Sequence, residues 1–101
     1  YKKMEKNLNS LDDLFDIITK KAKSKDSKSY TKLLLKSGKQ KIAQKVGEES
    51  FELIIDYLQG SKKRTVEEAS DLIYHLFVLL FSKKISLADI KKELKKRHNV
   101  R

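Results

Sequence analysis

Carboxylate side chains gather in one short stretch of this sequence, although the chain as a whole is basic. Seven of its fourteen Asp and Glu residues lie within 24 positions: Glu48, Glu49, Glu52, Asp56, Glu67, Glu68 and Asp71. Like charges three or four residues apart on a helix repel one another, and carboxylates beside apolar surface need a positive partner. The cluster therefore predicts a cation between these side chains.

Two pairs of the clustered acids have helical spacing. Glu49 and Glu52 share a face of one expected helix, and Glu68 and Asp71 share a face of the next. Both faces continue into apolar residues, so we expect the two pairs to face inward. Oxygen ligands without Cys or a His cluster favour a hard cation, Mg²⁺ or alternatively Mn²⁺, that keeps waters and binds phosphates. We predict a metal site formed by Glu49, Glu52, Glu68 and Asp71.

Each of these acids, taken alone, also has an ordinary structural explanation. Glu68 follows Thr65 at the spacing of a capping box, and Glu48 and Glu49 could belong to solvated helix faces. Lys45 could pair with Glu49 or Glu52 at helical spacing. These explanations suffice for single residues, whereas the set of acids at this spacing favours a metal.

The elements that would position the acids are helices. The sequence has no Pro and only three Gly, so it lacks the turn residues of a β-rich domain. We predict an all-α fold with four or five helices, using serine and threonine caps and glycine stops. They are a helix from Ser10 to about Lys23, a short helix after Ser29–Thr31 that closes near Gly38, a long helix from about Lys39 to Leu58, a helix from Thr65 to about Phe81, and a last helix that begins at Ser86.

The two long helices carry apolar residues on more than one side. On the first, one stripe contains Ile42, Val46, Leu53 and Tyr57, and nearly the opposite side contains Phe51, Ile55 and Leu58. The helix from Thr65 to Phe81 is apolar nearly all round and must be central. Gly47, inside the first helix, suggests close approach of a neighbour or a ligand. A chain this small cannot cover both helices alone, so we expect homodimerisation to complete a helical bundle.

Length and charge limit the remaining possibilities. The 101 residues form one domain, and a start at Tyr1 suggests excision from a longer or bifunctional polypeptide. The net charge of 24 − 14 = +10 permits nucleic acid, a membrane surface or a phosphorylated small molecule as partner. The longest nearly apolar run, Leu72 to Phe81, is about half the roughly 20 residues that a bilayer requires. The absence of Cys agrees with a cytoplasmic protein.

Three motifs resemble those of a known family. Glu49-x-x-Glu52, followed after fifteen residues by Glu68-x-x-Asp71, is similar to the paired motif of the all-α nucleoside triphosphate pyrophosphohydrolase (MazG-like) superfamily. More narrowly, the segments 29–31 (Ser-Tyr-Thr), 42–49 and 71–76 resemble phosphoribosyl-ATP pyrophosphohydrolases of histidine biosynthesis. The resemblance extends from about Leu11 to His98.

The resemblance implies that a homodimer hydrolyses phosphoribosyl-ATP to phosphoribosyl-AMP and pyrophosphate by Mg²⁺-assisted attack of water. The acids would hold the metal, with Glu49 in a catalytic role, and Glu48 is our candidate for orienting or deprotonating the water. Lysines near Gly38 and one turn before Glu49 could bind the remaining phosphate charge, namely Lys36, Lys39, Lys41 and Lys45.

Two alternative functions stay open at this point. A house-cleaning nucleotide pyrophosphohydrolase would use the same acids, and only the motifs around Tyr30 and His75 favour the histidine pathway. A helical nucleic-acid-binding module would use the basic tail from Lys91 to Arg101, but no reading element accompanies it, so specific recognition is disfavoured. We interpret His75 as a hydrogen-bonded core residue, Tyr30 and Tyr74 as core aromatics with wet hydroxyls, and Ser29 or Thr31 as a helix cap.

Overall fold

The computed structural model describes residues 8–26 and 28–100, with side chains through residue 98. Tyr1 and Arg101, on which two of the expectations above depend, lie outside these residues. Every regular element in the described part is a helix, which confirms the all-α prediction. The helices are α1 (Leu11–Lys23), α2 (Tyr30–Lys36), α3 (Lys39–Gln59), α4 (Lys62–Ser82) and α5 (Leu87–Val100).

Serine side chains begin four of the helices. The hydroxyl oxygens of Ser10, Ser29, Ser61 and Ser86 accept hydrogen bonds from backbone N–H groups three residues later and so cap α1, α2, α4 and α5. The predicted start of α4 at Thr65 is therefore wrong. The Thr65 hydroxyl instead donates to the backbone carbonyls of Ser61 at 2.9 Å and Asp56 at 3.2 Å. These bonds link α4 to the end of α3.

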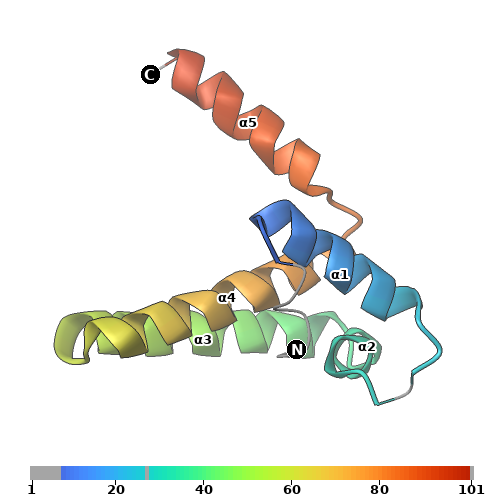
Figure 1. Ribbon diagram of the computed structural model, residues 1–101, viewed down its shortest axis with the longest axis horizontal. Helices are drawn as coiled ribbons and strands as arrows, with labels where there is room; N and C mark the ends of the chain where they lie inside the picture. Colours follow the sequence, from blue (N-terminus) through green and yellow to red (C-terminus); the bar gives the residue numbers. More distant parts are fainter. Residues whose placement is uncertain (1–7, 27, 101) are drawn as a thin grey trace.

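Helices α3 and α4 form a long antiparallel hairpin, and α1 and α2 cover one end of it (Figure 1). Only Gly60 and Ser61 separate the two long helices. Half of the eight buried hydrophobic residues belong to α4, which confirms its central position. The eight are Leu14, Ile18, Leu34, Ile42, Tyr74, Phe77, Val78 and Leu80.

Helix α5 leaves the body as an arm (Figure 1). The chain turns after α4 through Lys84, whose φ of 63° is left-handed, and Ile85 N–H bonds back to the Leu80 carbonyl at 2.9 Å. Lys91 of α5 forms an ion pair with Asp12 of α1 at 2.7 Å. Farther along the arm, Leu94 is 61% exposed. The first half of α5 is thus anchored, and its second half projects.

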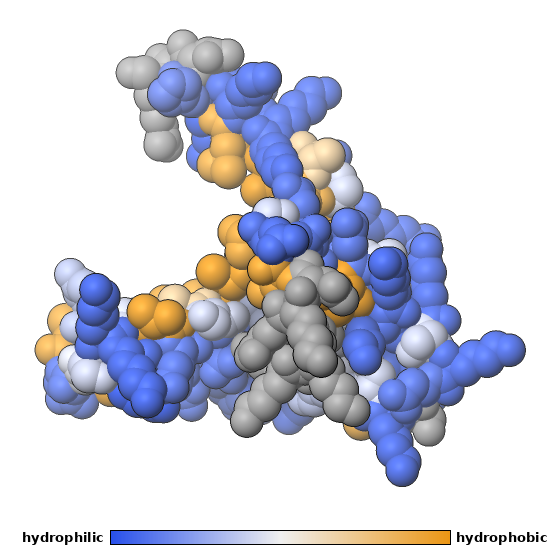
Figure 2. Space-filling view, viewed as in Figure 1, coloured by the Kyte–Doolittle hydropathy of each residue, from blue (hydrophilic) through white to orange (hydrophobic). Residues whose placement is uncertain are grey.

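The end of the hairpin near Gly60 carries large hydrophobic side chains that this chain leaves exposed. They include Phe51, Ile54, Tyr57, Leu58 and Val66. Figure 2 shows hydrophobic side chains lining the hollow between α5 and the hairpin, with more toward the hairpin's free end. A Cβ atom placed on Gly47 would meet no atom of the described residues within 4 Å, so none of them makes the close approach expected there.

No helix among the described residues combines the length and apolar character that crossing a membrane requires.

Candidate metal centre

Three carboxylates from the two long helices meet on the hairpin. Glu49 of α3 and Glu68 and Asp71 of α4 each offer an oxygen, and these oxygens lie within 4.8 Å of one another. The arrangement follows from the antiparallel pairing, because Glu49 lies on the side of α3 that packs on α4. The structure therefore brings together three of the four predicted ligands.

Two of these carboxylates are buried, and each has one oxygen without a partner. Glu49 is 8% exposed and Glu68 is 6% exposed. One oxygen of Glu49 lies 3.6 Å from Lys45 Nζ, and one of Glu68 lies 2.9 Å from Arg64 Nη2. The other oxygen of each, Oε2, is buried without a hydrogen bond. Buried polar atoms normally have partners, and an all-oxygen donor set suits a hard divalent cation, so the residues fit Mg²⁺ or Mn²⁺.

The protonation behaviour of the two glutamates agrees with this fit. Burial raises the pKa of Glu49, and the neighbouring carboxyls of Glu52 and Asp71 raise it further. Burial and then Glu52 likewise raise the pKa of Glu68, which Arg64 partly offsets. The site without a cation thus disfavours full ionisation of its acids, and a cation would compete with protons for them.

Two other predicted acids lie outside the close group. Glu52 is exposed, although its carboxyl is near enough to influence both Glu49 and Glu68. Glu48 is exposed and accepts a hydrogen bond from Gln44 at 2.9 Å. That bond, together with the charges of Lys45 and Lys41, lowers the pKa of Glu48 and keeps it ionised at neutral pH. The ligand role of Glu52 and the water-orienting role of Glu48 stay predictions.

The predicted phosphate-binding lysines lie at and after the junction of α2 and α3. Lys36, Lys39 and Lys41 are exposed, and Lys45 is half-buried beside the carboxylates. Desolvation lowers the pKa of Lys45, but nearby Tyr30, Glu49 and Glu48 outweigh it and raise the pKa above its ordinary value. Lys45 therefore keeps its positive charge next to the site.

The two motifs that favour the narrower family contact each other. The Tyr30 hydroxyl lies 2.9 Å from His75 Nε2, and His75 Nδ1 lies 2.7 Å from the Asp71 carbonyl oxygen. Because a carbonyl only accepts, Nδ1 carries a proton, and in the neutral ring Nε2 then accepts from the Tyr30 hydroxyl. The Thr31 hydroxyl similarly bonds the Tyr74 hydroxyl. The buried, bonded position of His75 and the capping role of Ser29 agree with our interpretation, whereas Tyr30, 44% exposed, is not a core residue.

Arg64 is a site neighbour that sequence reasoning missed. Its guanidinium contacts Glu68 at 2.9 Å, Glu67 at 3.0 Å and Asp56 of α3 at 3.6 Å. The pairing with Glu68 also shows that the capping-box role considered for Glu68 is wrong. The i,i+4 spacing of Arg64 and Glu68 was the available signal, but the contact with Asp56 depends on the hairpin.

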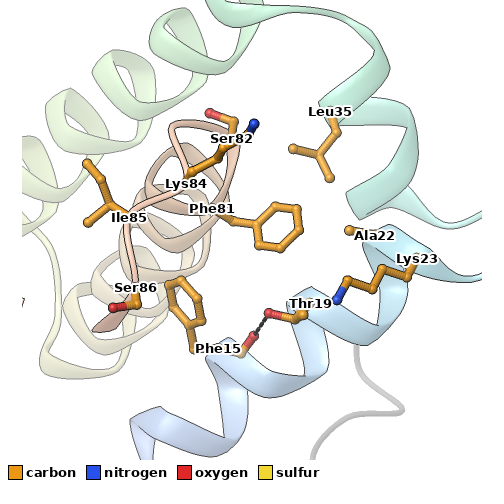
Figure 3. A pocket seen from close by; sticks show the side chains of 10 residues that line it. All are labelled: Phe15, Thr19, Ala22, Lys23, Leu35, Phe81, Ser82, Lys84, Ile85 and Ser86. Atoms are coloured by element: carbon orange, nitrogen blue, oxygen red, sulfur yellow. Dashed lines mark hydrogen bonds between the residues drawn. The ribbon is translucent and has the colours of Figure 1, made fainter. Parts of the chain in front are cut away.

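A cavity lies elsewhere among the described residues. It holds about 620 Å³ between α1, the end of α2 and the turn after α4, and Phe15 and Phe81 lie beside it (Figure 3). It shares no residue with the carboxylate group. The cavity and the candidate metal centre are therefore separate features of the fold.

Comparison with known proteins gives consistent similarities. Residues 11–98 match the family described as phosphoribosyl-ATP pyrophosphohydrolase. The chain is 49% identical over 89 residues to the phosphoribosyl-ATP pyrophosphatase of Sulfolobus acidocaldarius, covering 88% of this chain and 94% of that relative. It is 42% identical over 92 residues to the histidine biosynthesis bifunctional protein HisIE of Staphylococcus aureus, covering 91% of this chain but 44% of that relative. A HisIE protein of Bacteroides thetaiotaomicron is 45% identical over 86 residues, covering 85% of this chain and 42% of that relative.

Proposed function

The chain belongs to the phosphoribosyl-ATP pyrophosphohydrolase family, and on that premise we propose that it hydrolyses phosphoribosyl-ATP to phosphoribosyl-AMP and pyrophosphate in histidine biosynthesis. The observation that carries the proposal from the chain itself is the pair of unpartnered, buried oxygens of Glu49 and Glu68 beside Asp71. We place the activity in the cytoplasm, in agreement with the absence of Cys. The chain spans less than half the length of its HisIE relatives, and the proposal concerns this one step.

The proposed chemistry assigns a role to each group of side chains. Glu49, Glu68 and Asp71 would hold a divalent cation, with Glu52 beside them at the exposed edge. The cation, when bound, would neutralise phosphate oxygens and so favour attack by water. Glu48, ionised at neutral pH, orients the water and accepts its proton. Because the products are a monophosphate and pyrophosphate, the bond between the α and β phosphates breaks.

The lysines supply the remaining positive charge. Lys45 lies closest to the carboxylates. Lys36, at the end of α2, and Lys39 and Lys41, at the start of α3, extend the positive surface. A triphosphate carries more negative charge than one divalent cation neutralises, so additional point charges are needed for its binding. We propose these four lysines as the phosphate-binding residues.

We also propose that two copies of the chain associate through the free end of the hairpin. Tyr57 and Leu58 are each 74% exposed, and Phe51 is 66% exposed. Contiguous apolar surface of this kind is typical of a protein interface. The bundle would be completed by the partner's long helices, in an interface well above about 1,000 Å².

The decisive experiment measures pyrophosphate release from phosphoribosyl-ATP with Mg²⁺ and with EDTA, beside several ordinary nucleoside triphosphates. We expect metal-dependent release from phosphoribosyl-ATP far above that from the other substrates. Preference for another triphosphate would favour the house-cleaning alternative. Absence of release from every substrate would contradict an enzymatic role and leave the basic nucleic-acid-binding alternative, which a filter-binding assay with DNA and RNA tests.

A further inference from the structure

Arg64 joins the two long helices next to the carboxylate group. It lies in the first turn of α4, and its Nη2 atom is 2.9 Å from Glu68 Oε1 and 3.6 Å from Asp56 of α3. Its Nη1 atom is 3.0 Å from Glu67. A planar guanidinium with donors fixed in a fork is suited to several acceptors at once. The contacts therefore restrain both Arg64 and the acids that it touches.

The two oxygens of the Glu68 carboxylate have different surroundings. Oε1 is held by Arg64, whereas Oε2 is buried without a partner. A buried carboxylate with one oxygen in an ion pair is limited in rotation. We propose that Arg64 is a positioning residue, which holds Glu68 so that its free oxygen faces the cation. This inference rests on the proposed function only in assuming that the carboxylates bind a divalent cation.

Lys45 provides a comparison within the same site. It stands four residues before Glu49, as Arg64 stands four residues before Glu68, but its ion-pair partners are both on its own helix and lie 3.6–3.7 Å away. Its ammonium group sits on a flexible stem and can turn toward a phosphate. Arg64 contacts acids on two helices, at 2.9 and 3.0 Å on α4 and at 3.6 Å on α3. The two cations are thus suited to different roles, Lys45 to the substrate and Arg64 to the ligand geometry.

The positive charge of Arg64 would also repel a bound cation, and this repulsion opposes the benefit of holding Glu68 in place. The Arg64 side chain is 56% exposed, and water screens its charge. The Glu68 side chain is 8% exposed and loses its orientation when its partner is removed. Replacement of residues that orient metal ligands usually weakens metal binding by about 10- to 100-fold. Loss of Arg64 should therefore weaken cation binding rather than strengthen it.

The test measures Mn²⁺ binding by electron paramagnetic resonance in the absence of substrate. We expect Arg64→Gln to weaken Mn²⁺ binding about tenfold. Arg64→Lys should also bind more weakly, because one ammonium group does not replace the fork whose Nη1 atom reaches Glu67 while Nη2 reaches Glu68 and Asp56. The matched control is Arg97→Gln, which removes an exposed arginine with an ion pair of 2.9 Å to Glu93 on α5 and should leave binding unchanged. Circular dichroism confirms that each variant is folded.

Several outcomes would overturn the inference. Unchanged or tighter Mn²⁺ binding in Arg64→Gln would show that Arg64 only repels the cation or is neutral. Full affinity in Arg64→Lys would assign the effect to charge alone. Unchanged Mn²⁺ binding with a raised KM for phosphoribosyl-ATP would make Arg64 a substrate contact. A parent protein that binds Mn²⁺ without hydrolysing phosphoribosyl-ATP would contradict the proposed function but not this inference, whereas a parent that binds no Mn²⁺ would contradict both.

Discussion

The two ends of the α3–α4 hairpin are built from similar residues but have different surroundings. At the covered end, Ile42, Tyr74 and Val78 are almost fully buried by α1 and α2. At the free end, Tyr57 and Leu58 are mostly exposed. Helices that are apolar on several sides need cover along their whole length, and this chain supplies it at one end only. The carboxylates lie between the two ends.

The largest expected effect is a difference between matched substitutions at the two ends. Val78→Asp puts an unpaired carboxylate into the core and should cost more than about 4 kcal/mol, enough to abolish cooperative unfolding. Ile54→Asp, at a position 53% exposed, should keep the helical content and convert the proposed dimer into a monomer. Circular dichroism measures the first result and light scattering at micromolar concentration the second.

A parent protein that is monomeric at micromolar concentration would leave the exposed hydrophobic residues unexplained and remove the proposed dimer. A stable, folded Val78→Asp variant would show that the covered end is not the main core. Either result would remove the contrast between the two ends.

Asp71 lies between the covered and the free end of the hairpin. Its replacement in Asp71→Asn should lower turnover by about 1,000-fold while the protein stays folded. The substitution removes a ligand charge, and a divalent cation contributes several kcal/mol to stabilisation of phosphate charge in the transition state. Pyrophosphate release with excess Mg²⁺ measures the effect. Turnover at the parental rate in Asp71→Asn would refute the ligand assignment of this residue.

A smaller loss is expected for Glu48→Gln, about 100-fold in kcat with unchanged Mn²⁺ affinity. Glu48 is exposed and lies outside the close carboxylate group, so its replacement should leave cation binding intact. A parallel loss of metal affinity would make it a ligand. Unchanged kcat would assign the orientation of water to another residue.

The smallest expected effect is a pH dependence of stability without a cation. Burial and nearby carboxyls raise the pKa of Glu49 and Glu68 above the ordinary 4.5, so the folded chain holds these protons more tightly than the unfolded chain. Stability should therefore fall as pH rises from about 4.5 through the raised pKa values, and the loss should persist above them. Because the pKa of Glu48 is lowered, its contribution to stability changes only at pH values below that range.

Urea unfolding from pH 5 to pH 7 in EDTA tests this sign. Glu49→Gln should flatten the decline, because the amide does not titrate, and excess Mg²⁺ should oppose it by binding the ionised acids. A stability that rises with pH over this range in EDTA would show that the pairs with Lys45 and Arg64 dominate instead.

Much of the fold could be predicted from local signals. The caps at Ser10 and Ser86 gave correct helix starts, since capping depends on residues three positions apart. The same rule failed at Thr65, where Ser61 offered a cap one turn earlier and the threonine hydroxyl bonds to backbone carbonyls. Two overlapping cap patterns cannot be ranked without knowing where the preceding helix ends.

The site was predictable to the extent that it depends on helix periodicity. The helical spacing of Glu49, Glu68 and Asp71 predicted that these residues face inward together. In the structure their carboxylate oxygens lie within 4.8 Å of one another. Periodicity does not fix which oxygen of a carboxylate is free, nor does it show that Asp56 reaches Arg64 from the other helix. The bond between Tyr30 and His75 joins residues 45 positions apart and depends on how α2 packs on α4.

The two-residue connection between α3 and α4 has a consequence for the order in which this protein folds. Closing a short loop is fast and costs little chain entropy, so the hairpin that carries the acids should form early. Packing of α1 against α4 joins segments far apart in the sequence and should come later. Association of two copies depends on concentration and would be the last step. The carboxylates would then be neighbours before the molecule has its final shape.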